Sequence, residues 1–176
     1  MKYNEKTLKS EVKFEGNIIK LRVDTVLLPS GREATRELIE HPGGVAILPV
    51  DDDGNVYLVS QFRKPIEKTL LEAPAGKLAY GESHYDCGVR ELKEETGLTA
   101  GKITYLGYII PTPGYTNELI HLYLAQELSH GEQNTDEDEF VDVEKMNFDK
   151  VYNMCISGEI SDAKTVAVVF RAKEVI

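Results

Sequence analysis

Four glutamates and one arginine stand within residues 76–98 at spacings that suit an oxygen-ligated cation: Glu82, Arg90, Glu91, Glu94 and Glu95. On a helix, Glu91 and Glu95 are i,i+4 neighbours and Glu94 is i+3 from Glu91, so the three carboxylates repel one another. Hard cations such as Mg2+ or Mn2+ prefer oxygen ligands and would relieve this repulsion. The competing interpretation is a solvated acidic face, which explains three glutamates but not Glu82, Arg90 and the flanking glycines.

A helix is predicted to carry these carboxylates. Ser83, with Asp86 three residues later, is typical of an N-cap with a capping box, and Gly97 supplies a stop signal. The spacing predicts one apolar face, with the three glutamates directed away from it: Tyr85, Val89, Leu92 and Thr96.

The whole stretch resembles the Nudix box, Gly-x5-Glu-x7-Arg-Glu-(apolar)-x-Glu-Glu-x-Gly-(apolar). Every defined position of the box is matched: Gly76, Glu82, Arg90, Glu91, Leu92, Glu94, Glu95, Gly97 and Leu98. The resemblance implies an α/β protein, an α/β/α sandwich with a mixed sheet. It also implies a hydrolase that uses a divalent cation to cleave a nucleoside diphosphate linked to another group.

The reaction implied by the resemblance is attack of water on a phosphorus of the pyrophosphate. The cation, Mg2+ with Mn2+ as the alternative, neutralises the phosphates and lowers the pKa of bound water. Glu91 and Glu95 are the first choices as metal ligands because they share one helix face, and Glu94 flanks them. Glu82 either reaches the cluster or holds a ligand in place.

Two further roles near the box follow from its surroundings. The resemblance makes the backbone carbonyl of Ala75 another metal ligand. Arg90 directly precedes a ligand, so we expect it to orient the carboxylates through ion pairs rather than bind phosphate; a plain surface arginine is the alternative.

The general base is expected in the acidic loop at residues 132–139. In the family this loop often supplies the base or an extra metal ligand, which here indicates Glu137 or Glu139. Asp136 and Asp138 stay open because four acidic residues stand in a row. A merely solvated loop is the competing interpretation for each of them.

Residues outside the box point toward a substrate. Pro113, about 16 residues past Gly97, resembles the signature proline of ADP-ribose pyrophosphatases, although an ordinary turn proline would look the same. Further stretches resemble that subfamily: residues 36–43, 61–65, 72–78 and 136–140. The expected reaction is therefore hydrolysis of ADP-ribose to AMP and ribose 5-phosphate. The alternatives are the same chemistry on another nucleoside diphosphate sugar, such as GDP-mannose, and a non-catalytic nucleotide-sugar sensor.

Two arginines are the candidate phosphate contacts. Arg36 and Arg63 can each offer bidentate hydrogen bonds to phosphate, and a surface ion pair is the alternative for each. Glu37 and Thr112 are further candidates for contact with the nucleotide or ribose, beside Pro113.

The chain is predicted to have two parts. Residues 1–42 read as a small antiparallel β meander, too small to bury much by itself, and residues 43–176 as the hydrolase domain. The resemblance implies that the meander helps to hold the nucleotide and exchanges contacts in a homodimer. Near the C-terminus, Asn147 is predicted to cap a short helix that ends at Gly158, and Ser161 to cap the final helix.

Bulk composition excludes several classes of function. The net charge of −10 argues against nucleic-acid or anionic-membrane binding, and no apolar run approaches the ~20 residues of a membrane helix. No signal peptide is evident at the N-terminus. Two cysteines far apart, Cys87 and Cys155, are expected as free thiols in the cytoplasm.

Overall fold

The computed structural model describes residues 3–135 and 140–176, and the chain forms two compact units. The first unit contains the chain up to Gly43 together with Ile110–Glu118. The second unit contains Gly44–Ile109 and Leu119–Ile176.

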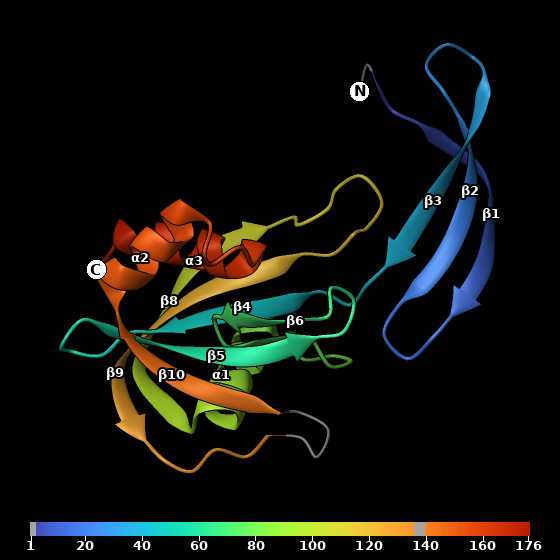
Figure 1. The fold of residues 1–176 in the computed structure, drawn as a ribbon. Coiled ribbons are helices and arrows are strands. Elements are labelled where there is room, and N and C mark those ends of the chain that lie inside the picture. The colour runs from blue at the N-terminus through green and yellow to red at the C-terminus, as the bar shows by residue number, and fades with distance from the viewer. Residues whose placement is uncertain (1–2, 136–139) are drawn as a thin grey trace. The chain divides into compact units, whose positions relative to one another are not determined.

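The first unit contains a three-stranded antiparallel sheet, in the order β1-β2-β3 (Figure 1). Its strands are β1 (Lys6–Glu15), β2 (Lys20–Leu27) and β3 (Glu33–Glu40). The predicted meander is thus confirmed. The turn between β1 and β2 is closed by a hydrogen bond from the Gly16 N–H to the Ile19 carbonyl, 3.0 Å long.

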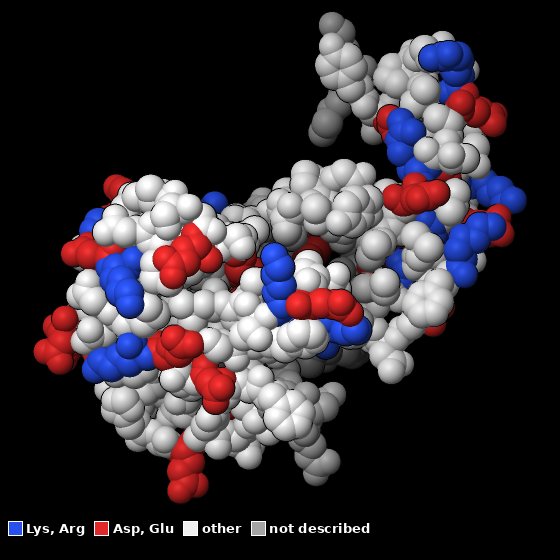
Figure 2. Space-filling view, viewed as in Figure 1, with Lys and Arg blue, Asp and Glu red and all other residues white. Residues whose placement is uncertain are grey.

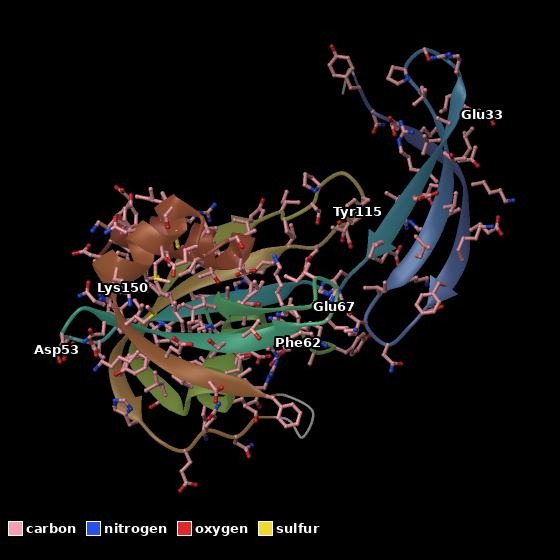
Figure 3. The ribbon with its side chains drawn as sticks, in the orientation of Figure 1. Glu33, Asp53, Phe62, Glu67, Tyr115 and Lys150 are labelled. Atoms are coloured by element: carbon pink, nitrogen blue, oxygen red, sulfur yellow. The ribbon has the colours of Figure 1, made fainter. Side chains whose placement is uncertain are left out.

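The segment Ile110–Glu118 is hydrogen-bonded to the end of β3. The Ile39 N–H donates to the carbonyl of Tyr115 (2.7 Å; Tyr115 is labelled in Figure 3), and the Asn117 N–H donates back to the Ile39 carbonyl (3.3 Å). The His41 N–H donates to the Asn117 side chain at 2.9 Å. The predicted domain division at residues 42 and 43 stays a prediction, and the segment that carries Thr112 and Pro113 belongs to the unit of the meander.

The second unit contains two sheets and three helices. One sheet is mixed, in the order β7-β4-β9-β8, with β4 and β9 parallel; the other is antiparallel, in the order β10-β5-β6. The strands are β4 (Gly44–Pro49), β5 (Asn55–Arg63), β6 (Lys68–Glu72), β7 (Ala75–Lys77), β8 (Leu98–Ile109), β9 (Ile120–His130) and β10 (Val141–Asn147). The helices are α1 (His84–Thr96), α2 (Phe148–Ser157) and α3 (Ala163–Lys173).

Strand β4 is buried on both faces and separates two hydrophobic cores. Val45 and Ile47 pack on the side of α1, while Ala46 and Leu48 alternate with them and pack on the side of α2 and α3. Figure 1 shows α1 and the α2–α3 pair on opposite sides of these strands. This period-2 alternation of a doubly buried strand produces the predicted α/β/α layering with a mixed sheet.

The surface and the thiols agree with the composition. Acidic and basic side chains are interspersed over the face of the second unit shown in Figure 2. Cys87 and Cys155 are buried and free, and burial raises the pKa of the Cys87 thiol to about 12. Among the described residues, none of the helices has the length and apolarity needed to cross a membrane.

Candidate active site

Helix α1 begins and ends where the sequence predicts. The Ser83 side chain accepts a hydrogen bond from the Asp86 N–H at 3.1 Å. Gly97 adopts the left-handed conformation, with φ of 70°, and its N–H donates to the carbonyl of Lys93 at 2.8 Å. Both caps satisfy backbone groups that the helix itself leaves unpaired.

The buried face of α1 differs from the predicted one. Tyr85 and Val89 are 49% and 38% exposed, so the predicted apolar stripe is wrong there and right at Leu92. The helix instead buries Cys87, Gly88, Glu91, Leu92 and Glu95. A Cβ on Gly88 would lie 3.2 Å from Cγ1 of Val45, so this small residue lets the helix approach β4 closely. The close approach turns two carboxylates toward the sheet.

These two carboxylates meet the backbone at the start of β7. Glu95 is 2% exposed, and its Oε2 accepts a hydrogen bond from the Ala75 N–H at 2.9 Å. Glu91 is 7% exposed, and its carboxylate lies so close to Gly76 that a Cβ there would stand 1.7 Å from Oε1. The first glycine of the box therefore provides space for a carboxylate.

Arg90 pairs with the other box glutamates. Its Nε and Nη2 donate to the two oxygens of Glu82 at 2.9 and 3.1 Å. Its Nη1 donates to Glu91 at 2.7 Å and to Glu94 at 2.9 Å. The hydrogen bonds from Arg90, helped by the Ala79 N–H, lower the pKa of Glu82 to about 2. This geometry is the one expected of an orienting ion-pair partner.

The carboxylates supply the donor type that a hard cation needs, but they are not gathered around one point. Within residues 3–135 and 140–176, no three carboxylate, imidazole or thiol groups form a ready metal cluster. The guanidinium of Arg90 stands between Glu91 and Glu94 and separates them. Two buried carboxylates at the backbone of Ala75 and Gly76 still fit an oxygen-ligated cation. The predicted ligand set therefore stays a prediction.

Arg63 lies at the end of β5 in an ion pair with Glu72. Its Nε and Nη2 each donate to one Glu72 oxygen at 2.7 Å, and Glu72 is 1% exposed. The hydrogen bonds with Glu72, and attraction to Glu95 among other acids, raise the pKa of Arg63. The structure thus shows the ion pair that competed with phosphate binding, and it places Arg63 within the electrostatic reach of Glu95.

Three residues around this pair were not predicted from the sequence. Lys164 binds Glu72, and the Thr165 hydroxyl accepts a hydrogen bond from the Ala73 N–H at 2.7 Å. Asp162, rather than the predicted Ser161, caps α3. A signal for the cap was present, because aspartate is among the preferred N-cap residues. Glu72 and Ala73, the partners of Lys164 and Thr165, are 92 positions away in the sequence and leave no local signal.

The remaining predicted substrate contacts lie in the first unit. Arg36 pairs with Glu5 through hydrogen bonds of 2.9 and 2.6 Å. Glu37 and Pro113 are exposed, and Thr112 is half-buried. The candidate bases lie outside the described residues: Glu137 and Glu139, with Asp136 and Asp138. Substrate and base roles for all of these residues stay predictions.

Comparison with known families agrees with this geometry. The NUDIX domain matches residues 40–169, and the nucleoside diphosphate sugar hydrolase N-terminal domain matches residues 5–39. The chain belongs to the Nudix family. The predicted resemblance is thereby confirmed over the catalytic unit and the meander.

Three relatives span most of this Nudix chain. It is 45% identical to an ADP-ribose pyrophosphatase of Bacillus subtilis (strain 168), over 92% of this chain and 88% of the relative. It is 41% identical to a methanol dehydrogenase activator of Bacillus methanolicus, over 95% and 91%. It is 34% identical to a GDP-mannose pyrophosphatase of Yersinia enterocolitica, over 74% and 73%.

A solved structure described as an ADP compounds hydrolase has the same fold. It superposes with a TM-score of 0.84 and covers 99% of this chain and 94% of its own, at 22% sequence identity. At that identity the likeness establishes the fold alone.

The space at Gly76 can be tested directly. In Gly76→Ala, the new Cβ would collide with Glu91, whose carboxylate must move away from the backbone of β7. Because Glu91 is predicted to be a metal ligand, we expect hydrolysis by the Nudix enzyme to fall by at least about tenfold. Steady-state kinetics at several Mg2+ concentrations measures this loss. Gly114→Ala, where a Cβ would meet nothing within 4 Å, serves as the stability control; normal activity of Gly76→Ala would contradict the assignment.

Proposed function

We propose that this Nudix enzyme hydrolyses the pyrophosphate of ADP-ribose to AMP and ribose 5-phosphate, with Mg2+ as cofactor and Mn2+ as a substitute. One observation carries the reaction class: Glu91 and Glu95 are buried on one helix face against the backbone of Ala75 and Gly76. Buried carboxylates are retained when they are paired or bind metal. The burial of Glu91 and Glu95 therefore supports a metal-binding role rather than a solvated acidic face.

The box residues and the acidic loop have separate proposed roles in metal binding, orientation of the carboxylates and proton transfer. Glu91 and Glu95, with the Ala75 carbonyl, would hold the cation, and Glu94 and Glu82 would complete the oxygen set. When bound, the cation supplies charge neutralisation and an activated water. Arg90 orients Glu82, Glu91 and Glu94 and offsets their mutual repulsion. Glu137 or Glu139 is the proposed base that takes the proton of the attacking water.

The substrate rests on different support. The relative at 45% identity is an ADP-ribose pyrophosphatase, and the match covers 92% of this chain, whose first unit carries Arg36, Glu37, Thr112 and Pro113. These residues are the proposed nucleotide and ribose contacts, and Arg63 is the proposed phosphate contact. GDP-mannose is the second candidate, supported by the Yersinia relative at 34% identity. A non-catalytic sensor is disfavoured because all four box glutamates are present.

Glu95→Gln tests the metal-binding role. The glutamine oxygen can still accept the Ala75 N–H, so the fold should be kept, while the negative charge is lost. Because even outer-shell partners of metal ligands contribute about 10–100-fold, we expect kcat to fall at least about 100-fold. Exposed Glu159→Gln is the matched control. Metal-dependent release of AMP is measured, and unchanged turnover in Glu95→Gln would exclude Glu95 as a ligand.

A substrate panel tests the specificity. ADP-ribose, GDP-mannose and other nucleoside diphosphate sugars are compared by kcat/KM, with the released nucleoside monophosphate and sugar phosphate identified. We expect ADP-ribose to be among the best substrates. A preference for GDP-mannose by more than about tenfold, or 1.4 kcal/mol in transition-state stabilisation, would favour the second candidate.

We also propose that the enzyme is a homodimer held in part by the first unit. Every residue of edge strand β1 is exposed, including Leu8 and Val12 at 46% and 48%. A long exposed edge strand with apolar side chains is normally covered. We expect light scattering to give twice the 19.7 kDa mass of one chain, and Val12→Glu to shift it toward one chain. Ser129→Glu on β9, also exposed, is the charge control; a monomeric wild type contradicts the proposal.

A further inference from the structure

The segment Glu72–Ala75 joins the end of β6 to the start of β7, and each of its four residues is hydrogen-bonded to another element of the second unit. We call this segment the strap. The Glu72 carboxylate binds Arg63 and Lys164, and the Ala73 N–H binds the Thr165 hydroxyl. The Pro74 carbonyl accepts from the Ile47 N–H at 2.9 Å. The Ala75 N–H donates to Glu95 at 2.9 Å. The strap therefore connects α3 to the carboxylates of α1.

The first turn of α3 holds the middle of the strap through Thr165. This residue is fully buried. Its hydroxyl donates to Oδ2 of Asp162 at 2.6 Å, so a lone pair of the same oxygen is left to accept the Ala73 N–H. Asp162 also accepts the Thr165 N–H at 3.0 Å as the N-cap of the helix. One threonine thus completes the cap and anchors the strap.

The end of the strap nearest β6 is held by charge. Arg63 binds both oxygens of Glu72. Lys164 binds Glu72 and also Asp162, the latter at 3.1 Å. Burial opposes ionisation of Glu72, but the hydrogen bonds from Arg63 and Lys164 leave its pKa below the ordinary value. A buried ion held in this way resists displacement, because moving it would leave a charge unpaired.

Resting on the proposed function, we propose that Thr165 is a positioning residue of the active site. Its hydroxyl fixes Ala73, and the strap transmits this constraint over two residues to Ala75, whose N–H holds Glu95 and whose carbonyl is the proposed metal ligand. Capping of α3 requires only the bond from the Thr165 N–H to Asp162. The additional hydrogen bond, from the Ala73 N–H to the Thr165 hydroxyl, joins α3 to the strap and holds the strap in place.

A first experiment tests, in the absence of any cation, whether Thr165 holds the strap closed at Ala75. Amide hydrogen exchange of Ala75 is measured by NMR in the metal-free protein for wild type, Thr165→Val and Thr165→Ser. Loss of the hydroxyl in Thr165→Val should speed Ala75 exchange about tenfold, because the strap opens locally. Thr165→Ser keeps the hydroxyl and should stay close to wild type. Asn147→Ala, which removes the N-cap of α2, should lower Tm and leave Ala75 exchange unchanged.

A second experiment measures Mn2+ affinity by calorimetry without substrate, and then the kinetics. Partners that orient metal ligands contribute about 10–100-fold to metal affinity, so Thr165→Val should raise the Kd of Mn2+ by that range. Its kcat should fall while KM for the sugar nucleotide stays near the wild-type value at saturating metal. Thr165→Ser should restore both, and Asn147→Ala should change neither.

The outcomes separate this proposal from the proposed function. If Thr165→Val lowers Tm but keeps wild-type Ala75 exchange and Mn2+ affinity, Thr165 is merely structural and the positioning role is overturned, while the proposed function stands. If the wild-type protein neither binds Mn2+ nor hydrolyses nucleoside diphosphate sugars, the proposed function is overturned and the positioning role with it. Rescue by Thr165→Ser but not by Thr165→Val supports the hydroxyl as the positioning group.

Discussion

Burial of two like charges on one face of α1 is the constraint on which the rest of the second unit depends. Glu91 and Glu95 are i,i+4 neighbours and both are almost fully buried. Each buried ion costs several kcal/mol unless charge or hydrogen bonds compensate it. Arg90 compensates Glu91 through its guanidinium, and the backbone of Ala75 compensates Glu95. That backbone and that arginine therefore help the helix to bury these two carboxylates.

This constraint explains why the buried face of α1 differs from the face that its apolar pattern predicts. A helix at a domain surface normally turns its apolar stripe toward the core. Here the stripe is rotated, and Tyr85 and Val89 remain largely exposed while two glutamates face the sheet. Gly88 makes the rotation possible because its missing Cβ lets α1 lie against Val45. Contacts with the sheet and the polar bonds at β7 therefore outweigh the periodicity that predicts a simple amphipathic helix.

Local features could be predicted from the sequence, and long-range partners could not. The caps at Ser83, Gly97, Asn147 and Gly158 follow from short-range chemistry, and the structure has all of them. The box itself is a fixed spacing and identifies the family. By contrast, the bond between Thr165 and Ala73 joins residues 92 positions apart. Neither the periodicity nor the composition of the sequence indicates such a pair. Lys164 and Glu72 are likewise 92 positions apart in the sequence.

The division of the chain also bears on specificity. The carboxylates of the box lie in the second unit, whereas Arg36, Glu37, Thr112 and Pro113 lie in the first. The loop between β8 and β9 joins the first unit because its backbone bonds to Ile39 of β3. Strand β3 and this loop, which carry the predicted substrate contacts and are far apart in sequence, are thereby hydrogen-bonded into one unit. With the proposed substrate contacts, such a unit would change the recognised sugar nucleotide while the proposed carboxylate chemistry stays the same, which fits relatives named ADP-ribose pyrophosphatase and GDP-mannose pyrophosphatase.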